Sequence, residues 1–209
     1  MSELFSIQLQ NRQQQGRDGV WLDLPTTTEQ VQAALRQIGI SSDNPQNLFI
    51  SGYFAEEEKR FAIPYNMVLA SNVDELNFLA ARLETLSAGE RAELNAALQA
   101  PQSELSSIGR ITDFPENVDY YVHLPDVTGT GQLGDYYLNR SGMVDMPEEW
   151  KGGIDTAQFG RYVAQQEQGA FTQYGYLVKS GDEWQKVHEG QPVPEEYRVL
   201  SFPAPEVLR

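Results

Sequence analysis

The sequence predicts an α+β fold arranged as three small domains in a row (α+β, helical bundle, α+β), which together make an elongated molecule. Strand-like and helix-like segments are mixed along the chain without the regular alternation of a parallel α/β sheet. Separate helix caps and apolar stripes fall within residues 1–72, 73–110 and 111–209. None of these groups of apolar residues is large enough to form a single hydrophobic core for the whole chain. Three small cores are therefore expected to pack end to end.

The first domain, residues 1–72, is expected to hold three strands and one helix. The expected elements are strands at residues 4–9, 20–24 and 47–54 and a helix between Thr26 and Gly39. Alternating apolar side chains predict the strands. Thr26 and Glu29 form an expected capping box, in which each side chain binds an unpaired backbone N–H group. Apolar residues at 31, 34, 35 and 38 then define one buried helix face.

The middle domain, residues 73–110, is expected to be a small helical bundle. Asn72 with Glu75 and Ser87 with Glu90 are the capping pairs that open its two main helices. Leucines at helical spacing give each helix a buried face, and Pro101 ends the second helix. A bundle of this size depends on its neighbours for stability.

The third domain, residues 111–209, mixes strands and helices and ends in an extended tail. The expected elements are a strand at 118–124, helices at 133–139 and 155–166, a strand or hairpin at 171–178 and one strand at 197–202. Pro147 followed by Glu148 and Glu149 is typical of the first turn of a further helix. Four prolines after residue 190 predict a tail that wraps as extended chain.

Composition excludes several classes of protein. Of 209 residues, 40% are apolar and 11% aromatic, which is enough for a folded core. No apolar run approaches the roughly 18–20 residues of a membrane-spanning helix, and the N-terminus lacks the pattern of a signal peptide. We therefore expect a cytoplasmic protein with no membrane partner. The chain has no cysteine and only two histidines, His123 and His188, which argues against thiolate chemistry, a multi-histidine zinc site and any cofactor.

Negative charge is the strongest compositional signal. Thirty acidic residues against fifteen basic ones give a net charge of −15. Such a chain repels nucleic acid, so no nucleic-acid partner is expected, and it attracts basic proteins. Solubility is the alternative explanation of the charge. The most one-sided stretch is residues 111–160, with nine acidic and two basic residues, and no Lys or Arg lies between Arg110 and Arg140.

One glycine motif points toward nucleotide binding but lacks the required context. Gly129, Gly131 and Gly134 match G-x-G-x-x-G, the dinucleotide fingerprint. Pro125 and Asp126 separate these glycines from the preceding strand, and no nearby cation would balance a pyrophosphate. The simpler interpretation is a flexible loop.

Catalytic pairs are equally weak. Glu148 and Glu149 match a glycosidase pair in residue type only, because adjacent acids in a polar context are normally just solvated. A lone histidine in an aromatic, strand-like run, as at His123, is more often packed than catalytic. The residues alone therefore indicate an acidic, non-enzymatic binding protein whose partner they do not identify.

Four blocks of sequence resemble the ArdA family of antirestriction proteins. They are Gly19–Pro25, Leu48–Tyr53, Asp74–Asn77 and Gly134–Gly142, the last continuing through Pro147, Ile154–Asp155 and Phe159–Arg161. Each block is short, and their order and spacing carry the resemblance from about residue 4 to residue 180.

The resemblance implies three small domains in a row, in agreement with the segmentation above. It also implies a non-enzymatic protein that mimics bent duplex DNA, with surface carboxylates in place of phosphates. Such a mimic occupies the DNA-binding groove of type I restriction–modification enzymes, in their methyltransferase core. Members of the family usually act as homodimers.

We expect the carboxylates of the most one-sided stretch to form the mimic surface. They are Asp113, Glu116, Asp119, Asp126, Asp135, Asp145, Glu148, Glu149 and Asp155, and Glu56, Glu57 and Glu58 extend this surface from the first domain. We expect the dimer to form through an exposed aromatic strand, where two copies could pair edge to edge. Its residues are Tyr120, Tyr121, Val122 and His123.

A second hypothesis belongs to a different class: an acidic adaptor for some other basic protein, or an uncharacterised hydrolase. Carboxylates aligned along one ridge favour the DNA mimic. A concave pocket that holds two facing carboxylates favours the hydrolase.

Overall fold

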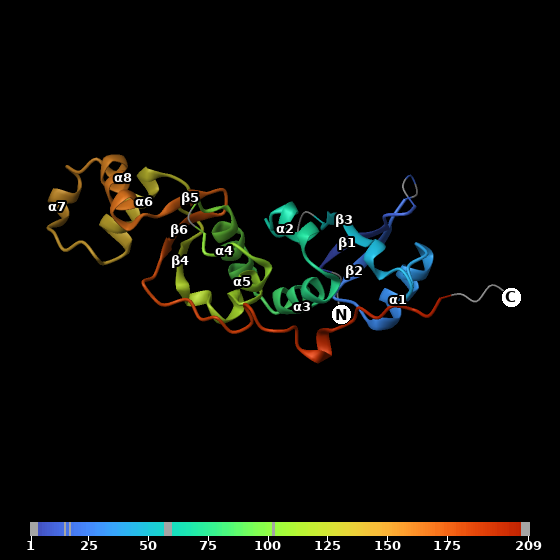
Figure 1. Cartoon of the computed structure of the whole chain (residues 1–209). Coiled ribbons are helices and arrows are strands. Elements are labelled where there is room, and N and C mark those ends of the chain that lie inside the picture. Colours follow the sequence, from blue (N-terminus) through green and yellow to red (C-terminus); the bar gives the residue numbers. More distant parts are fainter. Residues whose placement is uncertain (1–3, 15, 17, 57–59, 102, 206–209) are drawn as a thin grey trace. The chain divides into compact units, whose positions relative to one another are not determined.

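The computed structural model describes residues 4–14, 16, 18–56, 60–101 and 103–205. Over these residues the chain is a mixed α+β protein with two small antiparallel sheets and helices beside each of them, as expected (Figure 1). It divides into two compact units. The first comprises Met1–Leu86, Leu105–Pro115 and Lys186–Arg209, and the second comprises Ser87–Glu104 and Glu116–Gln185. No helix in the described parts of the chain has the length and apolar character to cross a membrane.

The first unit is built on a three-stranded sheet. Its strands are β1 (Phe5–Asn11), β2 (Val20–Leu24) and β3 (Leu48–Phe54), and its helices are α1 (Thr28–Gln37), α2 (Tyr65–Ala70), α3 (Val73–Glu84) and α5 (Ile108–Thr112), with 3-10 turns at Pro45–Asn47 and Glu195–Tyr197. The strand order is β2-β1-β3. Ile7 and Leu9 of β1 are fully buried on one face of the sheet, and α1 and α3 both contact β2. The three strands predicted in this part of the chain are thus confirmed.

The cap of α1 differs from the prediction by one residue. Thr27 is the N-cap: its hydroxyl accepts the N–H of Gln30 at 3.4 Å, and the Gln30 side chain accepts the N–H of Thr27 at 3.2 Å. The predicted pair of Thr26 and Glu29 is therefore wrong. Thr26 is buried and its N–H donates instead to Oδ1 of Asn77, on α3, at 2.7 Å.

The helices of the predicted middle segment are divided between the two units. The predicted caps are confirmed, because Asn72 opens α3 and Ser87 opens α4 (Ala88–Gln99) with reciprocal bonds to Glu75 and Glu90. However, α3 and α5 belong to the first unit, whereas α4 belongs to the second, where it contacts β4 and β6. The three-domain arrangement is not confirmed, and the domain boundaries and the elongated form stay predictions.

The second unit holds the other sheet. Its helices are α4, α6 (Thr130–Asp135), α7 (Glu148–Lys151) and α8 (Thr156–Glu167), with a π-helical turn at Tyr136–Arg140 and a 3-10 turn at Val118–Tyr120; its strands are β4 (Tyr121–Leu124), β5 (Ala170–Thr172) and β6 (Gly175–Lys179). A further 3-10 turn, Phe114–Glu116, lies where the sequence passes from one unit to the next. The strand order is β4-β6-β5, so β4 is an edge strand. The strand predicted at 118–124 starts only at Tyr121, because the preceding residues form a 3-10 turn.

Two glycines allow α6 and α8 to cross in close contact. A Cβ atom on Gly134 would lie 1.9 Å from the carbonyl oxygen of Thr156, and one on Gly160 would lie 1.9 Å from the carbonyl oxygen of Thr130. These distances leave no room for a methyl group.

The G-x-G-x-x-G stretch is the start of a helix, because Gly129 is the N-cap of α6 and Gly134 lies in that helix where it packs on α8. The loop interpretation is therefore wrong.

Substitution of Gly160 by Ala is expected to destabilise the second unit by about 3 kcal/mol, because the new methyl group forces two backbones apart. Gly131 offers a matched control, since a Cβ atom there meets nothing within 4 Å. Gly131→Ala should be neutral or slightly stabilising, because alanine has the higher helix propensity. Urea unfolding of both variants measures the difference. Equal stabilities would show that the helices can separate without cost.

The tail belongs to the first unit and runs past α3 and α1 (orange to red in Figure 1). Oδ1 of Asp74 accepts the N–H groups of Val199 and Leu200 at 2.8 and 2.7 Å, and Ser42 donates its N–H to the carbonyl of Pro203 at 2.9 Å. The tail is extended, as predicted. The strand predicted at 197–202 is wrong, because these residues form hydrogen bonds with side chains of the first unit rather than with a neighbouring strand.

Candidate partner-binding surface

Most of the predicted mimic carboxylates of the second unit are exposed. Four of them lie in loops, in a 3-10 turn or in the short helix α7, and have no ion-pair partner among the residues that the structure describes: Asp119, Asp126, Asp145 and Glu149. We call these four the unpaired set. Because none of the described cations pairs with them, they present negative charge to a partner.

Three other predicted carboxylates have local partners. Asp135, half-buried, lies 3.4 Å from Arg140, and Glu148 lies 2.6 Å from Lys151 one turn along α7. Asp155 is the N-cap of α8 and accepts two backbone N–H groups at 2.9 and 3.0 Å. These acids also stabilise local structure, so their charges are partly balanced before any partner arrives.

The remaining predicted acids have different surroundings. Glu116 and Glu56 are exposed, whereas Glu57 and Glu58 lie outside the described residues. Asp113 has an exposed fraction of 0%, so the expectation that it is a surface carboxylate is corrected. Its two oxygens accept the N–H groups of residues 187, 188 and 189 in the tail at 3.2, 2.6 and 3.1 Å. A carboxylate enclosed in this way holds the tail and cannot imitate a phosphate.

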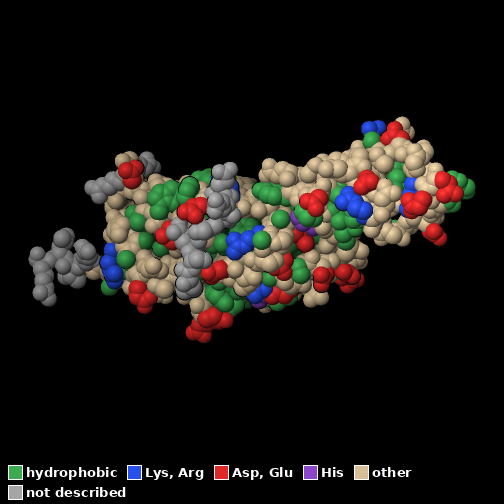
Figure 2. Space-filling model, turned by 180° about the vertical axis from the view of Figure 1, so that it is seen from behind, with side chains coloured by type: hydrophobic (Ala, Val, Ile, Leu, Met, Phe, Trp, Pro, Cys, Tyr) green, Lys and Arg blue, Asp and Glu red, His purple; other side chains and the backbone are tan. Residues whose placement is uncertain are grey.

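The visible face in Figure 2 carries Asp and Glu side chains dispersed over the surface, with Lys and Arg side chains between them. On this face the charge is therefore distributed rather than gathered in one deep site. Such distributed charges act chiefly by steering association, and salt screens them.

Glu93, on α4, is an acidic residue that sequence reasoning missed. Its Oε1 atom is buried and has no hydrogen-bond partner among the described residues. Burial, together with the nearby negative charges of Glu90 and Asp119, raises the pKa of Glu93 to about 8. The pattern of leucines on α4 predicted which face is buried, but it could not show that acids from two elements converge there.

The raised pKa of Glu93 has a consequence for stability. The folded state binds this proton more tightly than the unfolded chain does, so stability is lost as pH rises from about 4.5 to about 8. Glu93→Gln should remove this loss and stabilise the second unit, relative to the natural chain, by about 1–2 kcal/mol above pH 8, because partial exposure reduces the full effect. Below about pH 4, under the unfolded pKa of 4.5, the difference should vanish.

Urea unfolding at both pH values measures the effect, with Glu149→Gln as an exposed control. A stability difference that is the same at both pH values would mean that Glu93 titrates normally.

The residues of the predicted dimer strand are only partly available. Tyr120 and Tyr121 are buried, with Tyr121 packed edge to face on Tyr120 at 4.9 Å between ring centres. Val122 is 43% exposed. His123 is half-buried and its Nε2 lies 2.7 Å from the carbonyl oxygen of Tyr174. Since β4 is an edge strand, its backbone and Val122, rather than the two tyrosines, are what it offers to a second copy.

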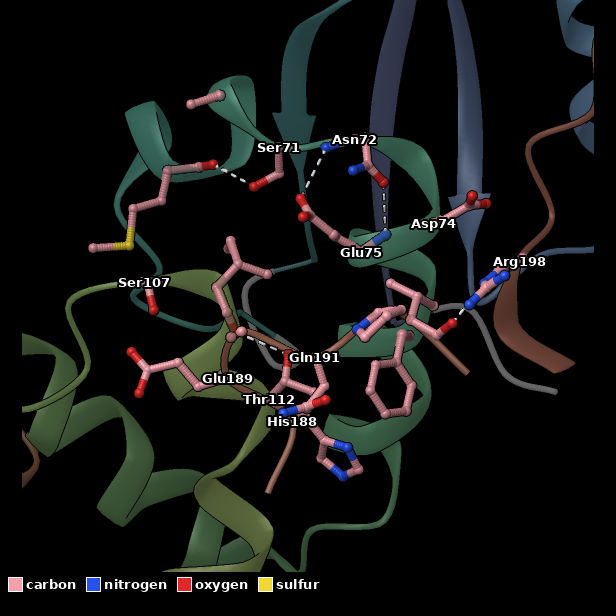
Figure 3. Close-up of a pocket in the computed structure, with 18 residues that line it drawn as sticks. Ser71, Asn72, Asp74, Glu75, Ser107, Thr112, His188, Glu189, Gln191 and Arg198 are labelled. Carbon is pink, nitrogen blue, oxygen red and sulfur yellow. Dashed lines mark hydrogen bonds between the residues drawn. The ribbon is translucent and has the colours of Figure 1, made fainter. Parts of the chain in front are cut away.

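The first unit contains a hollow of about 920 Å³ bordered by α2, α3, α5 and the tail (Figure 3). Three carboxylates line it. Asp74 accepts two tail amides, Glu75 accepts the N–H of Asn72 in the α3 cap at 3.3 Å, and Glu189 lies 3.0 Å from Arg110. These are contacts that hold the fold, so the hollow gives the hydrolase hypothesis no support.

A comparison with protein-family models matches residues 15–178 to "Antirestriction protein (ArdA)". This range covers more than half of the chain. The chain belongs to the ArdA family. No curated protein matches it.

Membership in the ArdA family confirms the resemblance inferred from the four sequence blocks. It makes the chain a member of an antirestriction family rather than of an enzyme family. The matched range includes both sheets in part and all of the unpaired set, whereas the tail that binds Asp74 and Asp113 lies beyond it.

Proposed function

We propose that the protein is a decoy of duplex DNA that occupies the DNA-binding groove of a type I restriction–modification enzyme. The match to the ArdA antirestriction family carries this proposal. The net charge of −15 and the exposed carboxylates of the unpaired set support it, because a DNA-binding groove is lined by cations that attract such a surface. We place this activity in the cytoplasm.

The amount of charge constrains the mechanism. Duplex DNA carries one charge per about 1.7 Å of length, so fifteen charges correspond to about 25 Å of duplex, and a dimer's thirty to about 51 Å. A mimic that covers a longer stretch is therefore more sparsely charged than DNA. The positions of the carboxylates, and contacts other than charge, must supply the rest of the affinity.

The proposed contact surface has two levels. The unpaired set contributes most of its charge, since these carboxylates are exposed and have no ion-pair partner among the described residues. The other exposed or half-buried acids of the second unit contribute less, namely Glu116, Asp135, Glu148 and Asp155, and Glu56 adds a charge from the first unit. Asp113 is left out because it is buried.

Competition with DNA tests the proposal. An immobilised type I methyltransferase core should retain the protein, and duplex DNA that carries the enzyme's recognition site should displace it. Raising the salt concentration should weaken binding, as for any surface of exposed charges. Retention that is indifferent to competing DNA would show that the protein does not occupy the groove.

We also propose a homodimer that pairs through β4, because this strand has a free edge and an exposed Val122. Sedimentation at tens of micromolar should show a dimer, a range typical of weak association. Val122→Asp should shift the protein to monomer. A dimer that survives this substitution would place the interface elsewhere, and a chain that is monomeric throughout would remove the dimer from the proposal.

A further inference from the structure

The solvent face of the first sheet carries exposed aromatic rings. Neighbouring residues on this face form two rows across the strands β2-β1-β3: Trp21, Gln8 and Gly52 in one row, and Asp23, Ser6 and Phe54 in the next. Trp21 is 49% exposed and Phe54 is 56% exposed. The opposite face holds the core, so these rings are not needed to close it.

The indole of Trp21 lies across the sheet rather than pointing away from it. A Cβ atom on Gly52, two strands away, would lie 2.9 Å from Cη2 of Trp21. The ring therefore reaches from β2 over the middle strand to β3, and the missing side chain at Gly52 gives it room. Phe54 lies beside it, with ring centres 6.4 Å apart and ring planes at 72°. The two rings support each other in fixed positions.

Asp23 places a carboxylate at the margin of these rings. It is exposed and lies two residues after Trp21 on the same face, about 7 Å along the strand. Its Oδ1 accepts the hydroxyl of Ser6 at 2.8 Å, which holds the side chain against the sheet. A carboxylate has about four lone-pair positions, so it can accept further donors.

We propose that Trp21, Phe54 and Asp23, which we call the aromatic platform, bind an arginine side chain of the basic protein partner. The inference rests on the proposed function and deepens it, because it adds a contact that does not imitate phosphate. A guanidinium group stacks on an indole and donates several N–H bonds to a carboxylate at the same time, which an ammonium group cannot do equally well.

Cationic side chains lie over aromatic rings elsewhere in the described residues, and Lys179 lies over the ring of Tyr120 at 5.8 Å. Arg12 lies over the ring of Phe49 at 5.4 Å, and Arg140 lies over the ring of Tyr136 at 5.6 Å. Exposed rings on a sheet can also stack bases of single-stranded nucleic acid. A net charge of −15 opposes the approach of a phosphate backbone, so a cationic protein side chain is favoured.

Arginine recognition can be tested on the protein alone. The chain has three tryptophans, and their indole N–H signals report separately in NMR spectra after assignment by Trp→Phe variants. Hexa-arginine should shift the Trp21 signal at a concentration at least about threefold lower than hexa-lysine of equal charge does. Trp184, whose indole Nε1 is buried and whose ring packs on Tyr120, serves as the internal control and should not discriminate between the peptides. Asp23→Asn should reduce the preference at Trp21.

The second experiment measures how tightly Trp21 variants bind the restriction enzyme. Trp21→Ala and Trp21→Leu should each weaken binding to the methyltransferase core about tenfold, as for a central anchor, because leucine restores apolar area but no π face. Tyr162→Ala, which removes a ring 59% exposed on α8, should leave the affinity unchanged.

The outcomes separate the two proposals. If the natural chain binds the enzyme and Trp21→Ala binds equally well, the platform is wrong and the decoy function stands. If the natural chain fails to bind the enzyme, the decoy function is wrong, and the peptide titration alone decides the platform. Equal response of Trp21 to both peptides, or a stronger response to single-stranded oligothymidine, overturns arginine recognition.

Discussion

Neutralising six exposed carboxylates of the second unit together is expected to abolish inhibition of a type I restriction enzyme. The six changes are Asp119→Asn, Asp126→Asn, Asp145→Asn, Glu148→Gln, Glu149→Gln and Asp155→Asn. Each single change should weaken binding by about 1 kcal/mol or less, because exposed charges are screened by water and salt. Their sum weakens affinity on the order of a hundredfold or more. Asparagine at position 155 still caps α8, so the variant should remain folded.

Two variants with four neutralised acids each can show whether the position of the negative charge matters for inhibition or only its amount. One neutralises the unpaired set. The other neutralises four exposed acids of the first unit: Asp18, Asp43, Glu195 and Glu196. Both lose the same charge, and we expect the first to lose much more inhibition in a DNA cleavage assay. If one single change removes all activity while the sixfold variant without it stays fully active, a discrete site acts in place of a distributed surface.

Local sequence signals predicted the helix starts well. Asn72 with Glu75 and Ser87 with Glu90 satisfy each other within one turn, so no distant residue is needed to find them. Thr26 shows the limit of this reasoning. It carries the right side chain for a cap, but its N–H is taken by Asn77, 51 residues away, and the cap moves to Thr27. The assignment of α4 to the second unit is non-local in the same way, because it depends on contacts with β4 and β6.

The sequence predicted that acidic residues form the candidate surface, but it could not predict which of these acids are exposed. Asp113 and Asp119 lie six residues apart in the same acidic stretch, yet one is buried under the tail and the other is exposed. The residues that enclose Asp113 follow about 75 positions later, so no pattern near it shows the difference. The aromatic platform was hidden for a related reason: the register of three strands, and a glycine two strands away, bring its rings together.

Replacement of Asp113 by Ala is expected to lower the free energy of unfolding of the first unit by roughly 3 kcal/mol. The carboxylate accepts three backbone N–H groups of the tail, and hydrogen bonds to a charged group are stronger than neutral ones. Without it, residues 187–189 lose these three hydrogen bonds, and the Arg110–Glu189 ion pair and the contacts with Asp74 must hold the tail. Urea unfolding, together with limited proteolysis of the tail, measures both effects.

Asp119→Ala is the matched control, because it removes an exposed carboxylate from the same stretch and should change stability by less than about 0.5 kcal/mol. Asparagine variants at the same two positions should differ in how well they inhibit the restriction enzyme. Asp113→Asn, which keeps one acceptor oxygen and enough of the anchor to fold, should inhibit as well as the natural chain, whereas Asp119→Asn should lose a small part of its affinity. A folded Asp113→Asn variant with strongly reduced inhibition would mean that the buried carboxylate, through the tail it holds, shapes the surface that the enzyme recognises.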